Sequence, residues 1–428
     1  MSALVRRSQA IGLNVMSSRC FSTAPGGVCK NFVIEQQSSM TEGRRTYLDH
    51  NATSPLRPQA MDALLRAGSL PGNASSVHAE GRAARALIER AREQVAPLVR
   101  GNPKGVIFTS GGTEANNTVL SPSFRRIGRD GASLLLVGSS EHISVLEGHR
   151  FAPDAMEPIP VDRAGRIDLS WLNERLGRAE GRRVLVSVQV ANNETGILQP
   201  VSEAARLVRD HGGLIHCDAV QAAGKVPLDM GALGVDALTV SAHKLGGPKG
   251  AGALVLADGF EVADRLVRGG GQERGSRAGT ENVAAIAGFG VAAELARSEV
   301  AEASERLRAL RDEAQLHLRR IAPDAVVFGA AEERLPNTLT FAVPGLRAET
   351  ALIAFDLAGL AVSSGSACSS GKVKRSHVLA AMGVDPGLSE GAIRVSFGWN
   401  STIEDVFGFV GACETVVTTL YKRRANAA

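Results

Sequence analysis

The segment Leu214-Ile-His-Cys-Asp-Ala-Val-Gln221 decides the fold, because an apolar run ends there on a carboxylate. Such a run is typical of a strand buried within a parallel sheet. Ligands of these sheets bind at the carboxyl ends of the strands, where Asp218 would lie. A buried carboxylate needs a positive partner, so we expect Asp218 to face either the protonated ring nitrogen of a ligand or a structural arginine.

Comparable β-rich runs lie on both sides of this segment and alternate with amphipathic stretches. Strands separated by helices require crossover connections, which predicts an α/β fold with a mostly parallel sheet in a large domain of residues 46–300. The predicted strands are Val106–Thr109, Ser133–Val137, Val184–Val190, Leu214–Cys217, Ala237–Val240 and Ala253–Leu256, and the predicted helices include Ala84–Leu98 and Ser202–Asp210.

Residues 301–428 are predicted to form a smaller C-terminal α+β domain. We place the boundary near residues 295–305, within a long helical stretch that continues through the charged segment Ala301–Ile321. Asn337–Val343 alternates as a strand should. Later elements are expected at Glu349–Ala358, Ala361–Ser363, Ile393–Phe397 and Ile403–Leu420.

Composition and charge exclude several classes of protein. Among the 428 residues, 44% are hydrophobic and 21% are charged, proportions that are ordinary for a soluble globular protein. The net charge of +4 belongs to residues 1–45, which hold six basic and two acidic side chains, so the remainder is neutral. A neutral body lacks the broad basic surface that a nucleic acid needs. The most apolar stretch, Val283–Ala293, is too short to span a membrane and is predicted to form a buried helix.

Residues 1–45 differ from the rest of the chain. They are rich in arginine and serine and contain no acid before Glu35, which is typical of an organellar transit peptide. Met40 offers an alternative start just before Tyr47, where the globular pattern begins. We therefore expect a disordered leader or an over-long start. The expected location is the cytoplasm, or the mitochondrial matrix if residues 1–39 are a genuine transit peptide.

The cysteines indicate a reactive thiol rather than a set of disulfide bonds. Their number is odd and no CxxC pair occurs, so neither a disulfide scaffold nor a metal site of the chain's own is expected. The five are Cys20, Cys29, Cys217, Cys368 and Cys413. Cys217 and Cys413 lie in apolar runs and are predicted to be buried. Cys368 lies in a Ser/Gly-rich segment followed by Lys372, Lys374 and Arg375, where exposure and nearby cations favour the thiolate.

A phosphate site is predicted in Phe108-Thr-Ser-Gly-Gly-Thr-Glu-Ala-Asn-Asn117, where a strand runs through a Gly-rich turn into a helix. Free N–H groups at the helix start and the Thr113 hydroxyl would bind a phosphate. Taken alone, the pattern also fits a tight turn with Thr113 as the helix cap. Dinucleotide and Walker motifs are absent, because no GxGxxG follows a strand and Gly365–Lys372 has the wrong spacing.

A Schiff-base lysine is predicted in Thr239-Val-Ser-Ala-His-Lys-Leu-Gly-Gly-Pro-Lys-Gly250. Lys244 leaves the end of a strand beside Ser241 and His243, an arrangement that can desolvate an amine and lower its pKa. Alone, this segment also fits a surface lysine on a loop. Together with the phosphate turn and Asp218, however, it supplies the three groups that pyridoxal phosphate requires.

With these residues the sequence resembles the cysteine desulfurases, class V members of the fold-type I pyridoxal-phosphate enzymes. The resemblance covers about 350 residues. It rests on the segments Tyr47-Leu-Asp-His-Asn-Ala-Thr-Ser-Pro55, Gly269-Gly-Gly-Gln-Glu-Arg-Gly-Ser-Arg-Ala-Gly-Thr280, Ser363-Ser-Gly-Ser-Ala-Cys368 and Ile393-Arg-Val-Ser-Phe-Gly398. The Ser-Ser-Gly-Ser-Ala-Cys run is similar to the long-loop group that serves iron–sulfur cluster assembly.

The resemblance implies a role for each site residue. Lys244 would carry the cofactor, His142 would stack on its ring and move protons, and Cys368 would receive the sulfur of L-cysteine as a persulfide. Arg394 would bind the substrate carboxylate bidentately. Asp218 would bind the ring nitrogen. Asn193 and Gln221 would lie near the ring hydroxyl, and Asn193 would also contact the substrate. The phosphate would be held by Gly112, Thr113, Ser241 and His243, and Thr280 would reach the phosphate of a neighbouring subunit.

The same resemblance implies a homodimer that passes sulfur to an acceptor or iron–sulfur scaffold protein, where the Cys368 persulfide would contact a nascent cluster. Two other reactions on this fold stay open, selenocysteine lysis and transamination of a small substrate. A sulfur carrier that has lost turnover is a third alternative. An exposed thiol at Cys368 argues against an aminotransferase, which has no need of one.

Overall fold

The structure is a computed structural model that describes residues 45–364 and 375–420. Cys368 and residues 1–44 of the predicted leader lie outside the described residues. Arg44–Ala428 group into one compact unit. In the described part of the chain, no helix is both long and apolar enough to cross a membrane.

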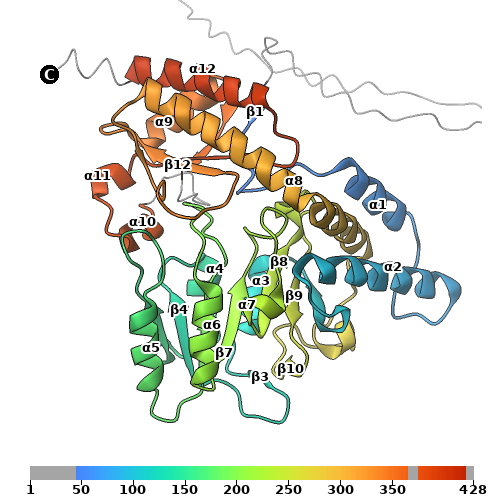
Figure 1. Ribbon diagram of the computed structural model, residues 1–428. Coiled ribbons are helices and arrows are strands. Elements are labelled where there is room, and N and C mark those ends of the chain that lie inside the picture. Colours follow the sequence, from blue (N-terminus) through green and yellow to red (C-terminus); the bar gives the residue numbers. More distant parts are fainter. Residues whose placement is uncertain (1–44, 365–374, 421–428) are drawn as a thin grey trace, which may run out of the picture. The chain divides into compact units, whose positions relative to one another are not determined.

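A seven-stranded sheet with the order β2-β9-β8-β7-β6-β4-β5 lies at the centre (Figure 1). Every pair from β5 to β8 is parallel, whereas β9 runs antiparallel to both of its neighbours. The strands are β2 (Val106–Thr109), β4 (Leu134–Gly138), β5 (Met156–Ile159), β6 (Val184–Ser187), β7 (Leu214–Asp218), β8 (Ala237–Ser241) and β9 (Gly252–Leu256). The predicted α/β fold with a mostly parallel sheet is confirmed.

Helices cover both faces of this sheet because its strands are apolar on both sides. Along β4, Leu134 and Leu136 join one buried cluster, and Leu135 and Val137 join another. This alternation follows from the two-residue period of a strand. The first cluster includes α2 (Ala79–Val95), α5 (Leu169–Gly177), α6 (Val201–Asp210) and the start of α8 (Val283–Ile321), and the second includes α3 (Gly112–Val119) and α4 (Ile143–Leu146).

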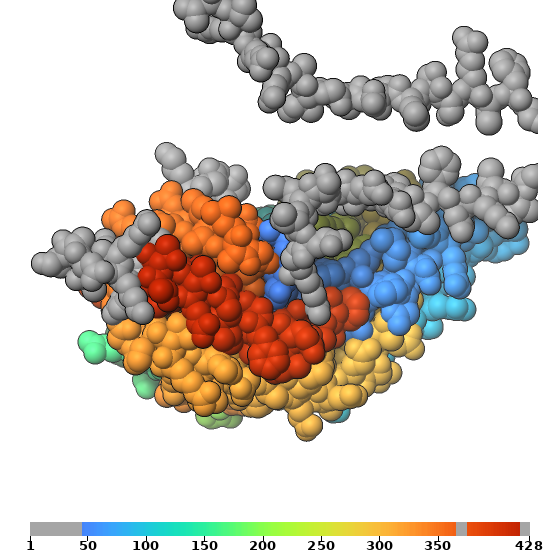
Figure 2. Space-filling model, turned by 90° about the horizontal axis from the view of Figure 1, so that it is seen from above, coloured from blue at the N-terminus to red at the C-terminus, as the bar shows by residue number. Residues whose placement is uncertain are grey.

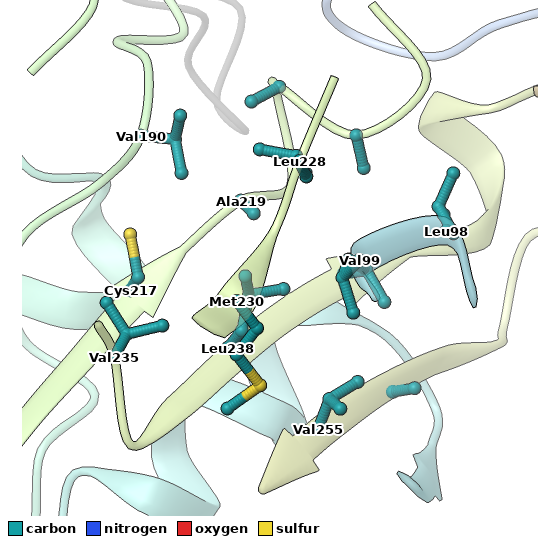
Figure 3. Close-up of a cluster of buried hydrophobic side chains, with 14 of the residues drawn as sticks. Leu98, Val99, Val190, Cys217, Ala219, Leu228, Met230, Val235, Leu238 and Val255 are labelled. Carbon is teal, nitrogen blue, oxygen red and sulfur yellow. The ribbon is translucent and has the colours of Figure 1, made fainter. Parts of the chain in front are cut away.

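Cys217 illustrates the packing of the first cluster. Its side chain is fully buried and lies with Met230, Val235 and Leu238 in Figure 3. Burial also raises the pKa of its thiol well above the ordinary value. Cys413 is buried as well, in the C-terminal part of the chain. The prediction that these two thiols are structural is therefore consistent with their surroundings.

A second, antiparallel sheet with the order β11-β12-β15-β14 follows α8. Its strands are β11 (Val326–Val327), β12 (Thr338–Ala342), β15 (Ile393–Ser396) and β14 (Ser363–Ser364), and the helices beyond α8 are α9 (Ala348–Leu357), α10 (His377–Ala381), α11 (Pro386–Ser389) and α12 (Ile403–Leu420). Figure 2 shows α12 beside α8, which it contacts. The division into two domains stays a prediction, since α8 runs continuously through the proposed boundary at 295–305.

The remaining elements tie distant segments together. The short strand β1 (Thr46–Tyr47) pairs with β13 (Leu360–Ala361), so the start of the described chain joins the C-terminal elements. The others are α1 (Pro58–Gly68), α7 (Met230–Leu233) and the antiparallel pair of β3 (Phe124–Arg126) with β10 (Phe260–Val262). Asp49 and Asn51 contact β15 and β12 of the second sheet, and the Ala52 carbonyl accepts from Lys244, which follows β8 of the central sheet.

Two predicted elements differ from the structure, and the strand β5 was not predicted. The predicted strand Val184–Val190 is too long, since β6 ends at Ser187, although Val190 N–H still donates to the Asp218 carbonyl at 2.8 Å. The predicted strand Ala361–Ser363 is instead two strands, β13 and β14, in different sheets. The strand β5 was not predicted, because Pro158 interrupts its apolar pattern. Proline is tolerated there because β5 lies at the edge of the sheet.

A buried ion pair fixes the Gly-rich segment that follows β9. Arg92 of α2 binds the Glu273 carboxylate with both terminal nitrogens, at 2.9 and 3.0 Å, and the backbone N–H of Phe108 donates to the same carboxylate. Both side chains are at most 3% exposed. Glu273 and Arg274 also have positive φ angles of 47° and 55°, which the pairing holds in place.

We expect Arg92→Met to lower the free energy of unfolding by about 3–5 kcal/mol, because it leaves the Glu273 carboxylate buried without its cation. Denaturant unfolding monitored by circular dichroism measures the change. Arg100→Met is the control, since Arg100 is largely exposed in its pair with Asp229 and its loss should shift the midpoint much less. Equal shifts in the two variants would contradict the prediction.

Candidate active site

The loops that follow β2, β4, β6, β7 and β8 form a cavity at the carboxyl ends of these strands. Its empty volume is about 640 Å³, with open solvent at the mouth included. The lining residues are Gly112, Thr113, Asn116, His142, Ser144, Gln189, Ala191, Asn193, Asp218, Val220, Gln221, Ser241, His243 and Lys244. Segments more than 130 residues apart in the sequence thus converge on one site, as the position of Asp218 predicted.

One end of the cavity has the features of an anion site. The first turn of α3 begins at Gly112, and a Cβ atom there would lie 2.8 Å from Cγ2 of Val220, so the close approach requires glycine. Opposite, the buried Ser241 hydroxyl has no hydrogen-bond partner among the described residues. The interpretation of Thr113 as the helix cap is wrong, because the cap position is Gly111. These donors are suited to a phosphate.

Asp218 lies at the end of β7 and has only neutral partners. Its two carboxylate oxygens accept from Nδ2 of Asn116 at 2.8 Å and from the backbone N–H of Val220 at 2.9 Å. No ion pair joins it to an arginine within the part of the chain that the structure describes, so the alternative of a structural arginine is not supported. Its remaining lone pairs face the cavity that it lines, where they can accept from a cationic ligand.

His142 is positioned by the start of α4. Its Nδ1 accepts from the backbone N–H of Ser144 at 3.1 Å, so the hydrogen bond assigns the proton of the neutral ring to Nε2. Burial lowers the pKa of this imidazole, and the positive charges of Lys244 and His377 lower it further against the opposing effect of Asp218. The neutral form is therefore favoured, with Nε2–H available as a proton donor.

Lys244 ends the single turn Ala242–Lys244 that follows β8. Its Nζ donates to the carbonyl oxygens of Asn51 and Ala52, at 2.9 Å for Ala52. Burial, aided by the charge of Arg394, lowers the pKa of the amine to about 8. The alternative of an exposed surface lysine is therefore wrong. An amine with this pKa is partly neutral near pH 8 and can act as a nucleophile.

Arg394 lies on β15 beside the cavity, although it does not line it. Its Nη2 binds Asp49 at 2.8 Å and its Nη1 donates to the Asn193 carbonyl at 3.0 Å. The Nε–H is buried without a partner among the described residues, and so is Oδ1 of Asn193. Arg394 thus has a carboxylate partner at one nitrogen and an unpaired buried donor at another.

Comparison with known proteins identifies the family. The model of the class V aminotransferases matches residues 46–409. A cysteine desulfurase IscS of Dictyoglomus turgidum is 38% identical over 381 residues, which cover 88% of this chain and 95% of that protein. A cysteine desulfurase of Gluconacetobacter diazotrophicus is 41% identical over 366 residues, which cover 84% and 90%. The chain belongs to the cysteine desulfurases.

Solved structures agree with this assignment. The NifS-like protein from Rickettsia africae superimposes with a TM-score of 0.79 at 33% identity, over 88% of this chain and all of that one. SspA in complex with cysteine has a TM-score of 0.68 at 26% identity, over 82% and 98% of the two chains. The family to which this desulfurase belongs depends on pyridoxal phosphate.

Not all predicted site residues of this cysteine desulfurase meet in the cavity. Thr280 is exposed and lines a separate cavity with Arg277 and Glu281. Cys368 lies outside the described residues. Two residues of the site were not predicted from the sequence. They are Asn116, which donates to the Asp218 carboxylate, and Ser144, whose backbone N–H donates to His142. Asn116 lies four residues after Gly112 on α3, and that helical spacing could have revealed it.

We expect the amine of Lys244 in the cofactor-free desulfurase to react half-maximally near pH 8. The neutral amine is the reactive form, so the rate of acylation rises with pH and levels off above the pKa. Competitive labelling with a trace acylating reagent, read by peptide mass spectrometry, measures this midpoint. The exposed Lys104, followed in the same digest, is the internal control for the reagent. A Lys244 midpoint near that of a free lysine amine, about 10.4, would refute the prediction.

Proposed function

We propose that this chain is a working pyridoxal-phosphate-dependent desulfurase that converts L-cysteine to L-alanine and leaves the sulfur on Cys368 as a persulfide. The proposal rests on one observation. The Lys244 amine, the Asp218 carboxylate and the anion-binding start of α3 all line the same cavity. The similarity to SspA in complex with cysteine supports the choice of substrate.

The donor set of the cavity fits the proposed cofactor. Gly112, Thr113, Ser241 and His243 would hold its phosphate, where the buried Ser241 hydroxyl lacks a partner among the described residues. Asp218 would bind the ring nitrogen, and Asn193 and Gln221 would lie near the ring hydroxyl. When bound, pyridoxal phosphate supplies an electron-withdrawing ring that weakens the bonds at the substrate α-carbon.

Three residues of the chain, Lys244, His142 and Arg394, would have separate roles in this reaction. Lys244 would hold the cofactor through its Nζ amine, whose lowered pKa favours the neutral, nucleophilic form. His142, neutral with its proton on Nε2, can donate that proton into the cavity. Arg394 orients the substrate carboxylate through Nε and its terminal nitrogens.

Sulfur transfer would use Cys368, whose sequence context favours a thiolate. The thiolate attacks the sulfur of the substrate, an S–S bond forms and the C–S bond breaks. The electron pair of the C–S bond stays with the substrate carbon, which takes up a proton and becomes the methyl group of alanine. Atoms and electrons therefore balance without an external oxidant.

We further propose that the enzyme is a homodimer that passes its sulfur to an iron–sulfur scaffold or a thiolation protein. The names of several relatives, cysteine desulfurase IscS, support the first acceptor. Thr280, exposed and away from the Lys244 cavity, is free to reach a neighbouring subunit's phosphate site.

Replacement of Lys244 by Ala should abolish both the visible absorption of the purified protein and its turnover, because the cofactor loses its attachment. Replacement of Cys368 by Ala should keep the absorption and abolish the release of alanine and sulfide from cysteine under reductant. Spectra and alanine assays on the two variants measure these outcomes. Turnover at the parent rate in the Cys368 variant would disprove the persulfide step, and incubation with selenocysteine or a keto acid tests the alternative reactions.

Replacement of Arg394 by Lys should raise KM for cysteine by roughly 10- to 100-fold, the loss expected when charged hydrogen bonds of about 1.5–3 kcal/mol are removed. Lysine keeps the charge but not the planar fork that a carboxylate binds. Steady-state alanine production measures the change, and Arg347→Lys, at an exposed position, is the control. An unchanged KM in the Arg394 variant would argue against carboxylate binding.

A further inference from the structure

Lys225 is a buried cation that the proposed reaction does not use. Its side chain is 5% exposed and does not line the cavity that contains Asp218, although it lines a smaller cavity together with Lys244. Among the residues that the structure describes, no carboxylate pairs with it. A buried lysine without an anion is costly, so its contacts need an explanation.

The Nζ atom of Lys225 donates to two amide oxygens. One is Oε1 of Gln221 at 2.9 Å, and the other is Oδ1 of Asn51 at 2.9 Å. Both partners also belong to the surroundings of Lys244. Gln221 lines the cavity, and the Asn51 carbonyl accepts from Lys244 Nζ. Lys225 therefore contacts two residues, Gln221 and Asn51, that themselves lie next to Lys244 or its cavity.

These contacts determine which way the Gln221 amide points. Its oxygen faces the Lys225 donor, and its Nε2 donates to the Asn51 carbonyl at 3.0 Å. In the reversed orientation the amide oxygen would face the Asn51 carbonyl, and two acceptors would repel each other. Both contacts therefore favour the same orientation, and the second N–H of Nε2 stays free on a side chain that lines the cavity.

The electrostatics of Lys225 agree with this arrangement. Burial, and then the positive charges of Lys244 and Arg394, lower the pKa of its amine well below the ordinary value. A lowered pKa favours the neutral amine, whose two N–H donors match the two oxygens that Nζ contacts.

We propose that Lys225 is a positioning residue, which orients the Gln221 amide so that an N–H donor faces the cavity where the ring oxygen of the cofactor binds. This inference rests on the proposed function. It predicts that Lys225 acts on cofactor binding only through Gln221. A residue that merely supported the fold would instead act independently of Gln221.

A double-mutant cycle on the full chain separates the two roles. The variants are Lys225→Met, Gln221→Ala and their combination, with Lys104→Met as a control at an exposed lysine. Each protein is stripped of cofactor and titrated with pyridoxal phosphate, and both the dissociation constant and the position of the visible band are recorded. We expect Lys225→Met and Gln221→Ala each to weaken binding by about 5- to 10-fold, the loss of one hydrogen bond, and the double variant to equal Gln221→Ala within about twofold. Additive losses, or an unchanged constant and band in Lys225→Met, would overturn the inference.

A second variant covers the case in which Lys225→Met does not fold. Gln221→Glu keeps an oxygen for Lys225 but has no N–H for the cavity. We expect it to fold and to bind the cofactor at least 10-fold more weakly than the parent. Binding as tight as that of the parent would overturn the inference. Failure of the proposed function is distinct, because then the parent itself would not form a visible band that depends on Lys244.

Discussion

The hydrogen bonds from Lys244 to the carbonyl oxygens of Asn51 and Ala52 connect the parts of this enzyme. Lys244 lies in the turn after β8 of the central sheet, whereas residues 49–52 follow β1, which pairs with β13 among the C-terminal elements. Asp49 binds Arg394 of the second sheet. One short segment therefore contacts both the Lys244 amine and Arg394, the arginine proposed to bind the substrate.

This arrangement concentrates positive charge in a partly buried region. Lys225, Lys244 and Arg394 lie close enough to lower the pKa of the lysine amines, while the carboxylates of Asp49 and Asp218 offset the effect at Lys244. Desolvation makes the neutral amine the less costly form of a buried lysine. The same physics that would destabilise a charged core thus prepares Lys244 for nucleophilic attack at moderate pH.

Much of the fold could be predicted because its signals are local. The strand Leu214–Cys217 and its neighbours could be predicted from their runs of apolar residues alone. Asp218 and Lys244 could be placed because each follows such a run. Asn51 could not be predicted, since its contact with Lys225 spans more than 170 residues, whereas the contact of Lys225 with Gln221 is local and was overlooked. The strand β5 was missed for the opposite reason, because Pro158 weakens its local signal while pairing with β4 stabilises it.

The pairing of Arg394 with Asp49 has a consequence for the proposed substrate binding. Asp49 accepts from Nη2 and the Asn193 carbonyl accepts from Nη1, so Nε is the guanidinium nitrogen that has no partner among the described residues. A fully bidentate contact requires one further nitrogen, which Asp49 or Asn193 must share. Arg394 is itself one of the charges that lower the pKa of the Lys244 amine, after burial. A carboxylate bound at Arg394 would weaken that effect and raise the pKa of Lys244.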